Sequence, residues 1–195
     1  NRHQALKRVR RGTGFIVNKN YALTAEHVIR DCSAVMIGYR GNELVVKVVT
    51  LDQSNDLGLL KSFEPFDETA KLRVDDIRLG ESVMTYGYPL IGQKSDTPSV
   101  ARGEVTRLVG QNDDSRLLQY SAETYPGSSG GPLLDLYGNV VGVVSSVLDD
   151  SQMINVYYAV KSKVAEVFLY SNAIDFKHGD STQELAGYEV ADKAS

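Results

Sequence analysis

Residues 127–132 read Gly-Ser-Ser-Gly-Gly-Pro and are followed by the apolar pair Leu133-Leu134. A serine nucleophile needs two backbone N–H groups aimed at the oxyanion that develops during attack, its own and that of the residue two positions earlier. A loop of this kind takes torsions that glycine adopts most readily. The stretch predicts Ser129 as a nucleophile and the amides of Gly127 and Ser129 as an oxyanion hole. Taken alone, the same sequence would also be compatible with a Gly/Ser turn that connects two strands.

A histidine upstream of this loop favours the catalytic interpretation. His27 lies in residues 23–29, Leu-Thr-Ala-Glu-His-Val-Ile, directly after a short β run. The other two histidines, His3 and His178, fall in a basic leader and a polar tail. A lone histidine would be interpreted as structural, but with Ser129 in the same chain His27 is the expected general base.

The third partner of such a pair is a carboxylate that binds the far imidazole nitrogen and fixes its tautomer. Asp56 is the preferred candidate, because it directly precedes the apolar residues 57–60, Leu-Gly-Leu-Leu, which would bury it. Asp52 lies four residues earlier in a more polar turn and stays open as an alternative.

Short β-branched or aromatic runs closed by Gly, Asn or Asp recur along most of the chain. They occupy residues 14–17, 21–24, 34–37, 44–50 and 57–60, and, after a connector at 61–79, residues 82–87, 100–108, 117–120, 140–146 and 155–160. Such even spacing is typical of antiparallel barrels or sandwiches, here in two β halves. Residues 160–171 carry apolar positions at helical spacing and predict a C-terminal helix.

The composition excludes several classes of protein. The chain has 195 residues and a net charge of -4, so nucleic-acid binding is not expected. No apolar run approaches the roughly 18 residues that span a membrane, so no membrane insertion is expected. The single cysteine, Cys32, cannot form an intrachain disulfide and is expected to be a core residue. Residues 1–11 predict a flexible basic leader and residues 173–195 a polar tail.

Metal, nucleotide and cofactor sites are not expected. Glu26-His27 lacks the second histidine four residues on that a helix-borne zinc motif requires. The Gly-Thr-Gly at 12–14 is not followed by a phosphate-loop lysine. The aspartate pairs at 113–114 and 149–150 lack further spaced oxygen ligands for calcium.

Together the motifs resemble those of the trypsin-like serine endopeptidases, and most closely the bacterial, disulfide-free HtrA (Deg) type. Residues 12–17 and 23–28 are similar to the family's glycine-rich first strand and Thr-Ala-x-His-Val motif. Residues 55–61 resemble its Asp-hydrophobic-Ala-Leu-Leu-Lys segment, with Gly58 where alanine is usual, and residues 127–132 resemble its nucleophile loop.

This resemblance, which covers about residues 12–169, implies a fold and a domain organisation. The implied fold is all-β, with two six-stranded antiparallel β-barrels and a C-terminal helix. The protease domain would span residues 12–172, with the first barrel at about 12–62 and the second at about 78–160.

The resemblance also implies a crevice between the barrels in which His27, Asp56 and Ser129 hydrolyse peptide bonds of polypeptide substrates. The walls of the primary pocket would be Thr124, Val144, Ser145, Ser146 and Val147. Small polar and β-branched walls predict a small or medium apolar side chain at the cleavage point. Glu123 either selects Lys or Arg from the pocket base or points outward, and the outward orientation is preferred.

Two departures from the family pattern bear on activation and context. Ser128 stands where the digestive members carry an aspartate that pairs with a freshly cut N-terminus. We therefore expect the oxyanion loop to be ordered by constitutive packing, by substrate, or by a neighbouring subunit or domain. The residues after 169 are too few for the PDZ module that HtrA-type proteins carry, so we expect a domain of a longer chain or a PDZ-free branch.

Three functions stay open on the sequence. The preferred one is a quality-control or processing endopeptidase; the alternatives are a catalytically silent trypsin fold that serves as a binding or scaffold module, and a viral-type processing protease of narrow specificity. For a bacterial member the resemblance implies a periplasmic or secreted location. It is compatible with a homo-oligomer or an additional domain outside this chain, and it implies no cofactor.

Overall fold

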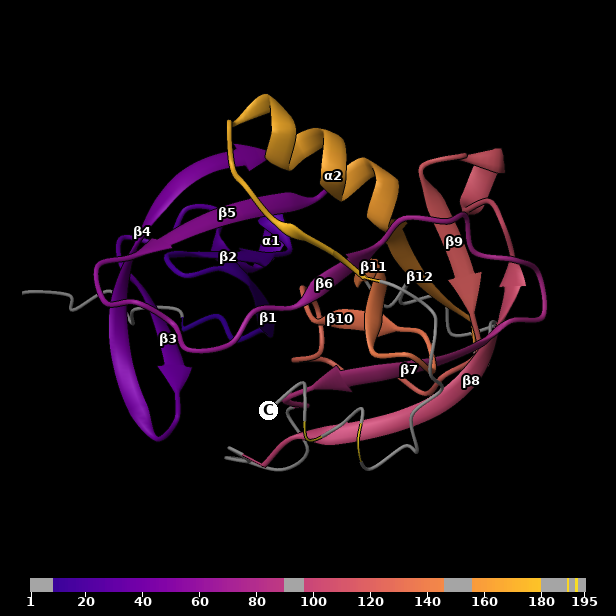
Figure 1. The fold of residues 1–195 in the computed structure, drawn as a ribbon, viewed down its shortest axis with the longest axis horizontal. Coiled ribbons are helices and arrows are strands. Elements are labelled where there is room, and N and C mark those ends of the chain that lie inside the picture. The colour runs from indigo at the N-terminus through magenta and orange to yellow at the C-terminus, as the bar shows by residue number, and fades with distance from the viewer. Residues whose placement is uncertain (1–8, 90–96, 146–155, 180–188, 190–191, 193–195) are drawn as a thin grey trace, which may run out of the picture.

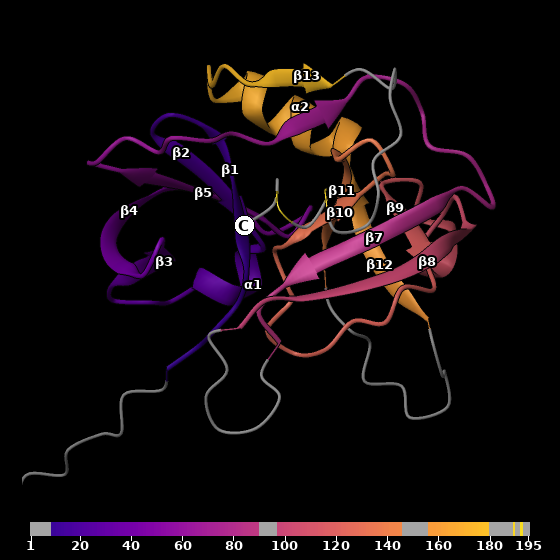
Figure 2. The ribbon, with the colours of Figure 1, turned by 60° about the horizontal axis from the view of Figure 1, so that its bottom comes forward.

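The computed structural model describes residues 9–89, 97–145, 156–179, 189 and 192. The described strands form two groups that lie side by side, and helix α2 (Ser162–Ser171) lies over their junction (Figures 1 and 2). The N-terminal group supplies the histidine and aspartate predicted above, and the second group supplies the serine loop.

The first group is a curled antiparallel sheet in the order β1-β2-β5-β4-β3. Its elements are β1 (Gly14–Asn18), β2 (Tyr21–Thr24), the short helix α1 (Glu26–Ile29), β3 (Val35–Tyr39), β4 (Asn42–Asp52) and β5 (Leu57–Ser62). Ala22, Ile29, Val46, Leu60 and Phe66 form its buried interior. Apolar runs of strand length between residues 12 and 62 number only five, so the sixth strand implied by the resemblance has no candidate segment there.

The second group closes into a six-stranded barrel. Its strands are β7 (Ser82–Gly87), β8 (Ser99–Arg107), β9 (Leu117–Tyr120), β10 (Pro132–Leu134), β11 (Asn139–Val144) and β12 (Tyr157–Lys161). The short 3-10 helix η1 (Gln111–Asp113) lies between β8 and β9. The order β10-β7-β8-β9-β12-β11 is closed by pairing of β10 with β11. The predicted all-β class with a C-terminal helix is confirmed, and the two β halves are a six-stranded barrel and a five-stranded half-barrel.

Two short strands lie in segments that were not expected to hold strands. Strand β6 (Lys71–Arg73) lies inside the connector at 61–79 and pairs in parallel with β11. Strand β13 (Lys177–Gly179) lies in the predicted polar tail and pairs in parallel with β6. The chain after α2 therefore returns to the edge of the second sheet.

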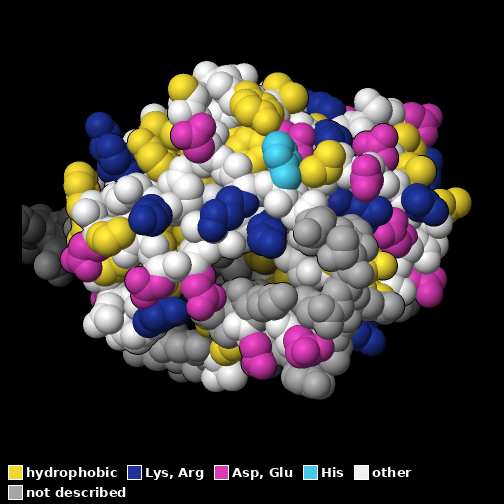
Figure 3. Space-filling view, in the orientation of Figure 1, with side chains coloured by type: hydrophobic (Ala, Val, Ile, Leu, Met, Phe, Trp, Pro, Cys, Tyr) yellow, Lys and Arg dark blue, Asp and Glu magenta, His cyan; other side chains and the backbone are white. Residues whose placement is uncertain are grey.

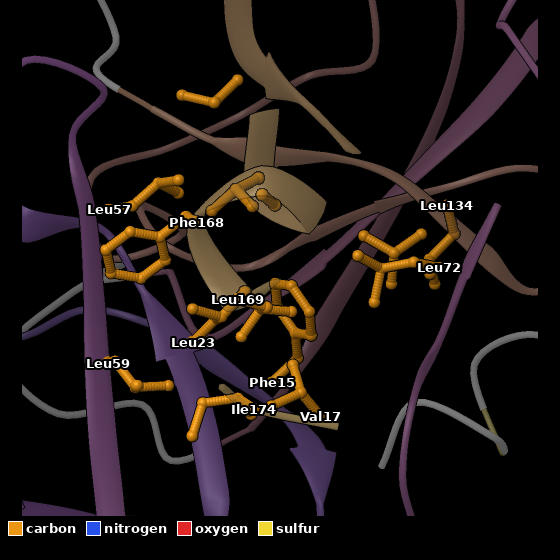
Figure 4. Packing of buried hydrophobic residues seen from close by; sticks show 14 of the residues in the cluster. Phe15, Val17, Leu23, Leu57, Leu59, Leu72, Leu134, Phe168, Leu169 and Ile174 are labelled. Atoms are coloured by element: carbon orange, nitrogen blue, oxygen red, sulfur yellow. The ribbon is translucent and has the colours of Figure 1, made fainter. Parts of the chain in front are cut away.

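The core beneath α2 is shared by both strand groups. Phe168 and Leu169 of α2 pack in one cluster with Leu23 and Leu57 of the first group (Figure 4). The same cluster includes Val143 of the second group. Burial of this apolar surface stabilises the two groups against each other. The helix begins at Ser162, two residues later than the pattern predicts, because β12 continues through Lys161.

Acidic and basic side chains are interspersed over the face seen in Figure 3, with hydrophobic side chains in small groups between them. Within the described ranges, no helix combines the length and the apolar character needed to cross a bilayer.

Candidate active site

The structure brings Asp56 and His27 into direct contact. Both carboxylate oxygens of Asp56 lie 2.9 Å from His27 Nδ1, and Asp56 Oδ1 also accepts the His27 backbone N–H at 3.0 Å. An ionised carboxylate only accepts hydrogen bonds, so the proton of this pair lies on Nδ1 and the lone pair of Nε2 stays available as a base.

The environment of Asp56 keeps its carboxylate charged. Burial by itself would raise the pKa of Asp56, but hydrogen bonds from the His27 side chain and from Ser145, and then from the His27 amide, outweigh burial and lower it. The Ser145 hydroxyl donates to Asp56 Oδ2 at 2.6 Å. Sequence reasoning placed Ser145 in the substrate pocket and missed this contact, which joins residues 89 positions apart.

Local backbone geometry presents the two side chains to each other. Asp56 adopts a φ of +52°, a left-handed conformation that aspartate tolerates better than most residues. Its carbonyl accepts the Glu26 N–H at 3.2 Å, which ties the start of α1 to the turn before β5. At the other end of α1, Arg10 Nη1 donates to the carbonyls of His27 and Arg30 at 3.1 and 2.7 Å. The leader residue Arg10 thus caps the helix that carries His27; residues 1–8 of the predicted leader, His3 included, lie outside the described residues.

Asp52, the alternative acid, has a different environment. Its Oδ1 accepts the backbone N–H groups of Ser54 and Asn55, both at 3.1 Å, and its Oδ2 accepts the Asn55 side-chain amide at 2.6 Å. Asp52 therefore shapes the turn that leads to Asp56, and among the described residues Asp56 is the carboxylate on His27.

The loop that carries Ser129 is docked on both strand groups. The Ser129 carbonyl accepts the Thr13 N–H at 2.9 Å, and the Gly130 N–H donates to the Val144 carbonyl at 2.7 Å. Gly130 has a φ of +85°, and a Cβ there would lie under 3.0 Å from Thr13 and Thr24 atoms. Only glycine fits this close approach of the loop to the first group.

The two amides predicted to form the oxyanion hole make no hydrogen bond to a described protein acceptor. Within the part of the chain that the structure describes, neither the Gly127 N–H nor the Ser129 N–H donates to a protein acceptor. The neighbouring Ser128 N–H donates to the Tyr125 carbonyl at 3.0 Å, which closes the turn. Ser129 is half-buried, and no hydrogen bond in the described part joins its hydroxyl to His27.

The predicted pocket residues that are described lie close to the loop but are buried. Val144 packs in the core of the second barrel. The Thr124 hydroxyl is bonded to the Tyr120 hydroxyl and the Ala122 carbonyl, both at 3.0 Å. Burial raises the pKa of Tyr120, so its hydroxyl stays neutral. The remaining two predicted pocket residues, Ser146 and Val147, lie outside the described residues.

Glu123 is exposed, and its outward orientation stays a prediction. It lies beside Tyr125, and its carboxylate raises the pKa of the Tyr125 hydroxyl. In the described ranges, no group of three or more His, Cys, Asp or Glu side chains is arranged to hold a metal ion. The aspartate pair at 149–150 lies outside those ranges.

Comparison with known proteins gives three findings. A family model described as a trypsin-like peptidase domain matches residues 12–143. The uncharacterized protein y4bJ of Sinorhizobium fredii is 40% identical over 194 residues, which cover 94% of this chain and 31% of that protein. A probable periplasmic serine endoprotease, DegP-like, of Chlamydia trachomatis is 30% identical over 160 residues, which cover 80% of this chain and 32% of that protein.

A solved structure matches the fold over most of its length. The Rv3671c protease of M. tuberculosis in its active form superposes with a TM-score of 0.73 at 23% identity, over 89% of this chain and 78% of that chain. At this identity the likeness concerns the fold. The chain spans about a third of the length of the curated relatives that it matches.

Proposed function

Because the chain belongs to the trypsin-like peptidase family and has HtrA/DegP-like relatives, we propose that it is a serine endopeptidase. His27, Asp56 and Ser129 form its triad, and the amides of Gly127 and Ser129 form its oxyanion hole. The observation that carries the proposal is the contact of both Asp56 oxygens with His27 Nδ1, in a fold where the serine loop is hydrogen-bonded to the strand group that bears this pair.

In the first half of the reaction, His27 Nε2 takes the proton of the Ser129 hydroxyl as Ser129 Oγ attacks the substrate carbonyl carbon. The carbonyl oxygen becomes an oxyanion and accepts the Gly127 and Ser129 N–H groups. The imidazolium then gives the proton to the leaving amine, which leaves an acyl-enzyme. Asp56 stays ionised throughout and stabilises the imidazolium.

Water releases the acyl group in the second half of the reaction. His27 takes a proton from the water as its oxygen attacks the acyl carbon, and returns it to Ser129 as the ester bond breaks. The His27–Ser129 contact would form when the substrate fills the crevice, since catalytic hydrogen bonds are often long before substrate binds.

The substrates would be polypeptide segments that are unfolded or exposed, because the scissile bond must reach a half-buried serine. Quality control or processing of proteins in the periplasm is the setting that the DegP-like relative supports. A further domain outside this chain is proposed as well, since its relatives are about three times as long.

The proposal is tested by treating the folded protein with a fluorophosphonate probe and locating the adduct by mass spectrometry. We expect a single adduct on Ser129, lost in Ser129→Ala and His27→Ala. Ser99→Ala and His178→Ala are matched controls, because both residues lie in other elements and should leave labelling unchanged.

Failure of the folded protein to label would contradict a constitutive protease. Binding of a polypeptide by the unlabelled protein would then favour the silent trypsin fold. Cleavage of one short sequence only would favour a processing protease of narrow specificity over a quality-control enzyme.

A further inference from the structure

Thr13, just before β1, is a hydrogen-bonding centre between the two strand groups. It is 4% exposed. Its N–H donates to the Ser129 carbonyl at 2.9 Å, and its hydroxyl donates to the Gly127 carbonyl at 2.7 Å. The same hydroxyl accepts the Tyr88 N–H at 3.0 Å, and the Thr13 carbonyl accepts the Thr24 hydroxyl at 2.6 Å. One residue therefore holds the carbonyls of both residues whose amides form the proposed oxyanion hole.

The chemistry of these partners fixes the direction of each hydrogen bond. The Tyr88 N–H can only donate and the Gly127 carbonyl can only accept, so the Thr13 hydroxyl directs its proton to Gly127. A valine in place of Thr13 would have nearly the same shape but would leave the part-buried Tyr88 N–H and the carbonyl of the buried Gly127 without these partners. Serine would keep both bonds.

The loop needs such an anchor. Gly127 has a φ of +99°, and glycine rotates between torsions with little steric resistance. Rotation of Gly127 would turn its N–H away from the substrate oxygen. Ser128, 7% exposed, carries no charge that could hold the loop through an ion pair. The Gly127 N–H lies on the preceding peptide, and the bond from the Thr13 hydroxyl to the Gly127 carbonyl holds the Gly127–Ser128 peptide, which restricts the concerted change of φ and ψ at Gly127 that would turn this N–H.

We propose that Thr13 is a positioning residue that keeps the oxyanion loop in its anion-binding conformation before substrate arrives. The inference rests on the proposed function and adds to it the means by which the loop is ordered. The hydroxyl bond to Gly127 and the amide bond to Ser129 hold the loop from the first strand group, so that no cleaved N-terminus is required. Thr13 also accepts a hydrogen bond from Thr24, which lies three residues before His27. The same residue therefore holds the segment that carries His27 and the loop that carries Ser129 at a fixed separation.

The test compares Thr13→Val with Thr13→Ser and with Ser62→Ala. Ser62 is 2% exposed, and its hydroxyl also accepts a backbone N–H, from Glu64, at a site remote from the loop. For Thr13→Val we expect kcat on a peptide substrate to fall about 10- to 100-fold with KM changed less than about threefold, since loss of one oxyanion donor lowers kcat by about 10²- to 10³-fold. Thr13→Ser should keep kcat within about threefold of the parent protein, because it keeps both hydroxyl bonds.

A second measurement does not depend on activity. Amide hydrogen exchange by NMR reports the Ser128 and Gly131 N–H groups, which are bonded within the loop to Tyr125 and Ser128. Their exchange should be at least about tenfold faster in Thr13→Val, with Thr13→Ser and Ser62→Ala near the parent values. If thermal unfolding shows that Thr13→Val does not fold, Thr13→Ala carries the same comparison.

The two proposals fail in different ways. An active parent protein whose Thr13→Val variant keeps its kcat and its loop exchange rates would overturn the role of Thr13 and leave the protease intact. A parent protein that neither labels nor cleaves would contradict the proposed function, and the exchange rates alone would then decide whether Thr13 holds the loop. Equal losses of kcat in Ser62→Ala and Thr13→Val would assign the effect to general destabilisation and overturn the inference.

Discussion

The Ser145 hydroxyl and the Asp56 carboxylate are joined by a hydrogen bond of 2.6 Å, although the two residues belong to different strand groups. Asp56 precedes β5 of the half-barrel, and Ser145 follows β11 of the closed barrel. The carboxylate that contacts His27 is thus oriented from both sides of the crevice. Its geometry depends on the docking of the two groups as well as on the local turn.

Asp56→Asn should abolish most activity while leaving the fold intact. The amide of asparagine would donate to Nδ1, so the imidazole would carry its proton on Nε2 and could not accept the Ser129 proton. We expect kcat to fall roughly 10⁴-fold, as in other triads that lose this charge. Steady-state peptide hydrolysis measures the effect, with Asp52→Asn as the control, because Asn can still accept the turn N–H groups. A greater loss in Asp52→Asn than in Asp56→Asn would reverse the assignment.

Ser145→Ala should reduce stability and alter its dependence on pH. The pKa of Asp56 is lowered in the folded protein, so the carboxylate contributes stability that is complete above its ordinary value of 3.8 and is lost as pH falls through the lowered pKa. Without the Ser145 hydroxyl the pKa rises toward the ordinary value, and that contribution shrinks. We expect a loss of about 1–3 kcal/mol at pH 7, a range typical of hydrogen bonds to charged groups.

Urea unfolding of the parent protein and Ser145→Ala, at pH 7 and at pH 3, measures both effects. The difference in unfolding free energy between the parent protein and Ser145→Ala should be smaller at pH 3 than at pH 7. The same difference in unfolding free energy at pH 3 and at pH 7 would show that Ser145 does not act through the Asp56 charge.

Gly130→Ala should disrupt the serine loop. The position has a positive φ, and an added Cβ would meet backbone atoms of Thr13 and Ala25, which cannot move aside as a flexible side chain can. We expect a loss of at least about 2 kcal/mol in unfolding free energy and no fluorophosphonate labelling. Gly38→Ala, which meets nothing within 4 Å, should stay within about 0.5 kcal/mol of the parent protein. A labelled, stable Gly130→Ala protein would contradict the tight docking of the loop.

Arg116→Ala should lower activity through the turn before Asp56. Arg116 reaches from the closed barrel to the Ser54 carbonyl at 2.6 Å and to Asn55 Oδ1 at 3.1 Å, and it lines a hollow between the groups with Asp56. Loosening this turn should reduce kcat about tenfold, because small displacements of catalytic groups lower the rate of the chemical step. Arg107→Ala is the matched control, since this exposed arginine pairs with Asp113 away from the site. Equal kcat values in the two variants would show that the bridge does not position Asp56.

Sequence reasoning works well where the chemistry is local. The start of β2 at Tyr21 and the extent of β7 from Ser82 to Gly87 match the predicted runs, because strands that are buried on both faces form short continuous runs bounded by turn residues. Residues 127–132 indicate a glycine-dependent loop for the same kind of reason, since the positive φ values of Gly127 and Gly130 exclude most other residues.

Long-range contacts are beyond such reasoning. Strands β6 and β13 have three residues each and exist because they pair in parallel across about a hundred residues of sequence. Their sequences, Lys-Leu-Arg and Lys-His-Gly, are shorter than the roughly four to eight residues over which a strand pattern can be recognised. Arg10 lies in the predicted flexible leader, but its guanidinium donates to the carbonyls of His27 and Arg30; charge composition does not reveal which carbonyls an arginine will reach.

The division of the site between two strand groups has a consequence during synthesis. The half-barrel with His27 and Asp56 emerges from the ribosome first, but Ser129 and Ser145 emerge much later. The second barrel closes only when β12, ending at Lys161, can pair with both β9 and β11. A nascent chain therefore cannot bring His27, Asp56 and Ser129 together in this geometry before β12 has been translated, so under the proposed function cleavage would not begin before that point.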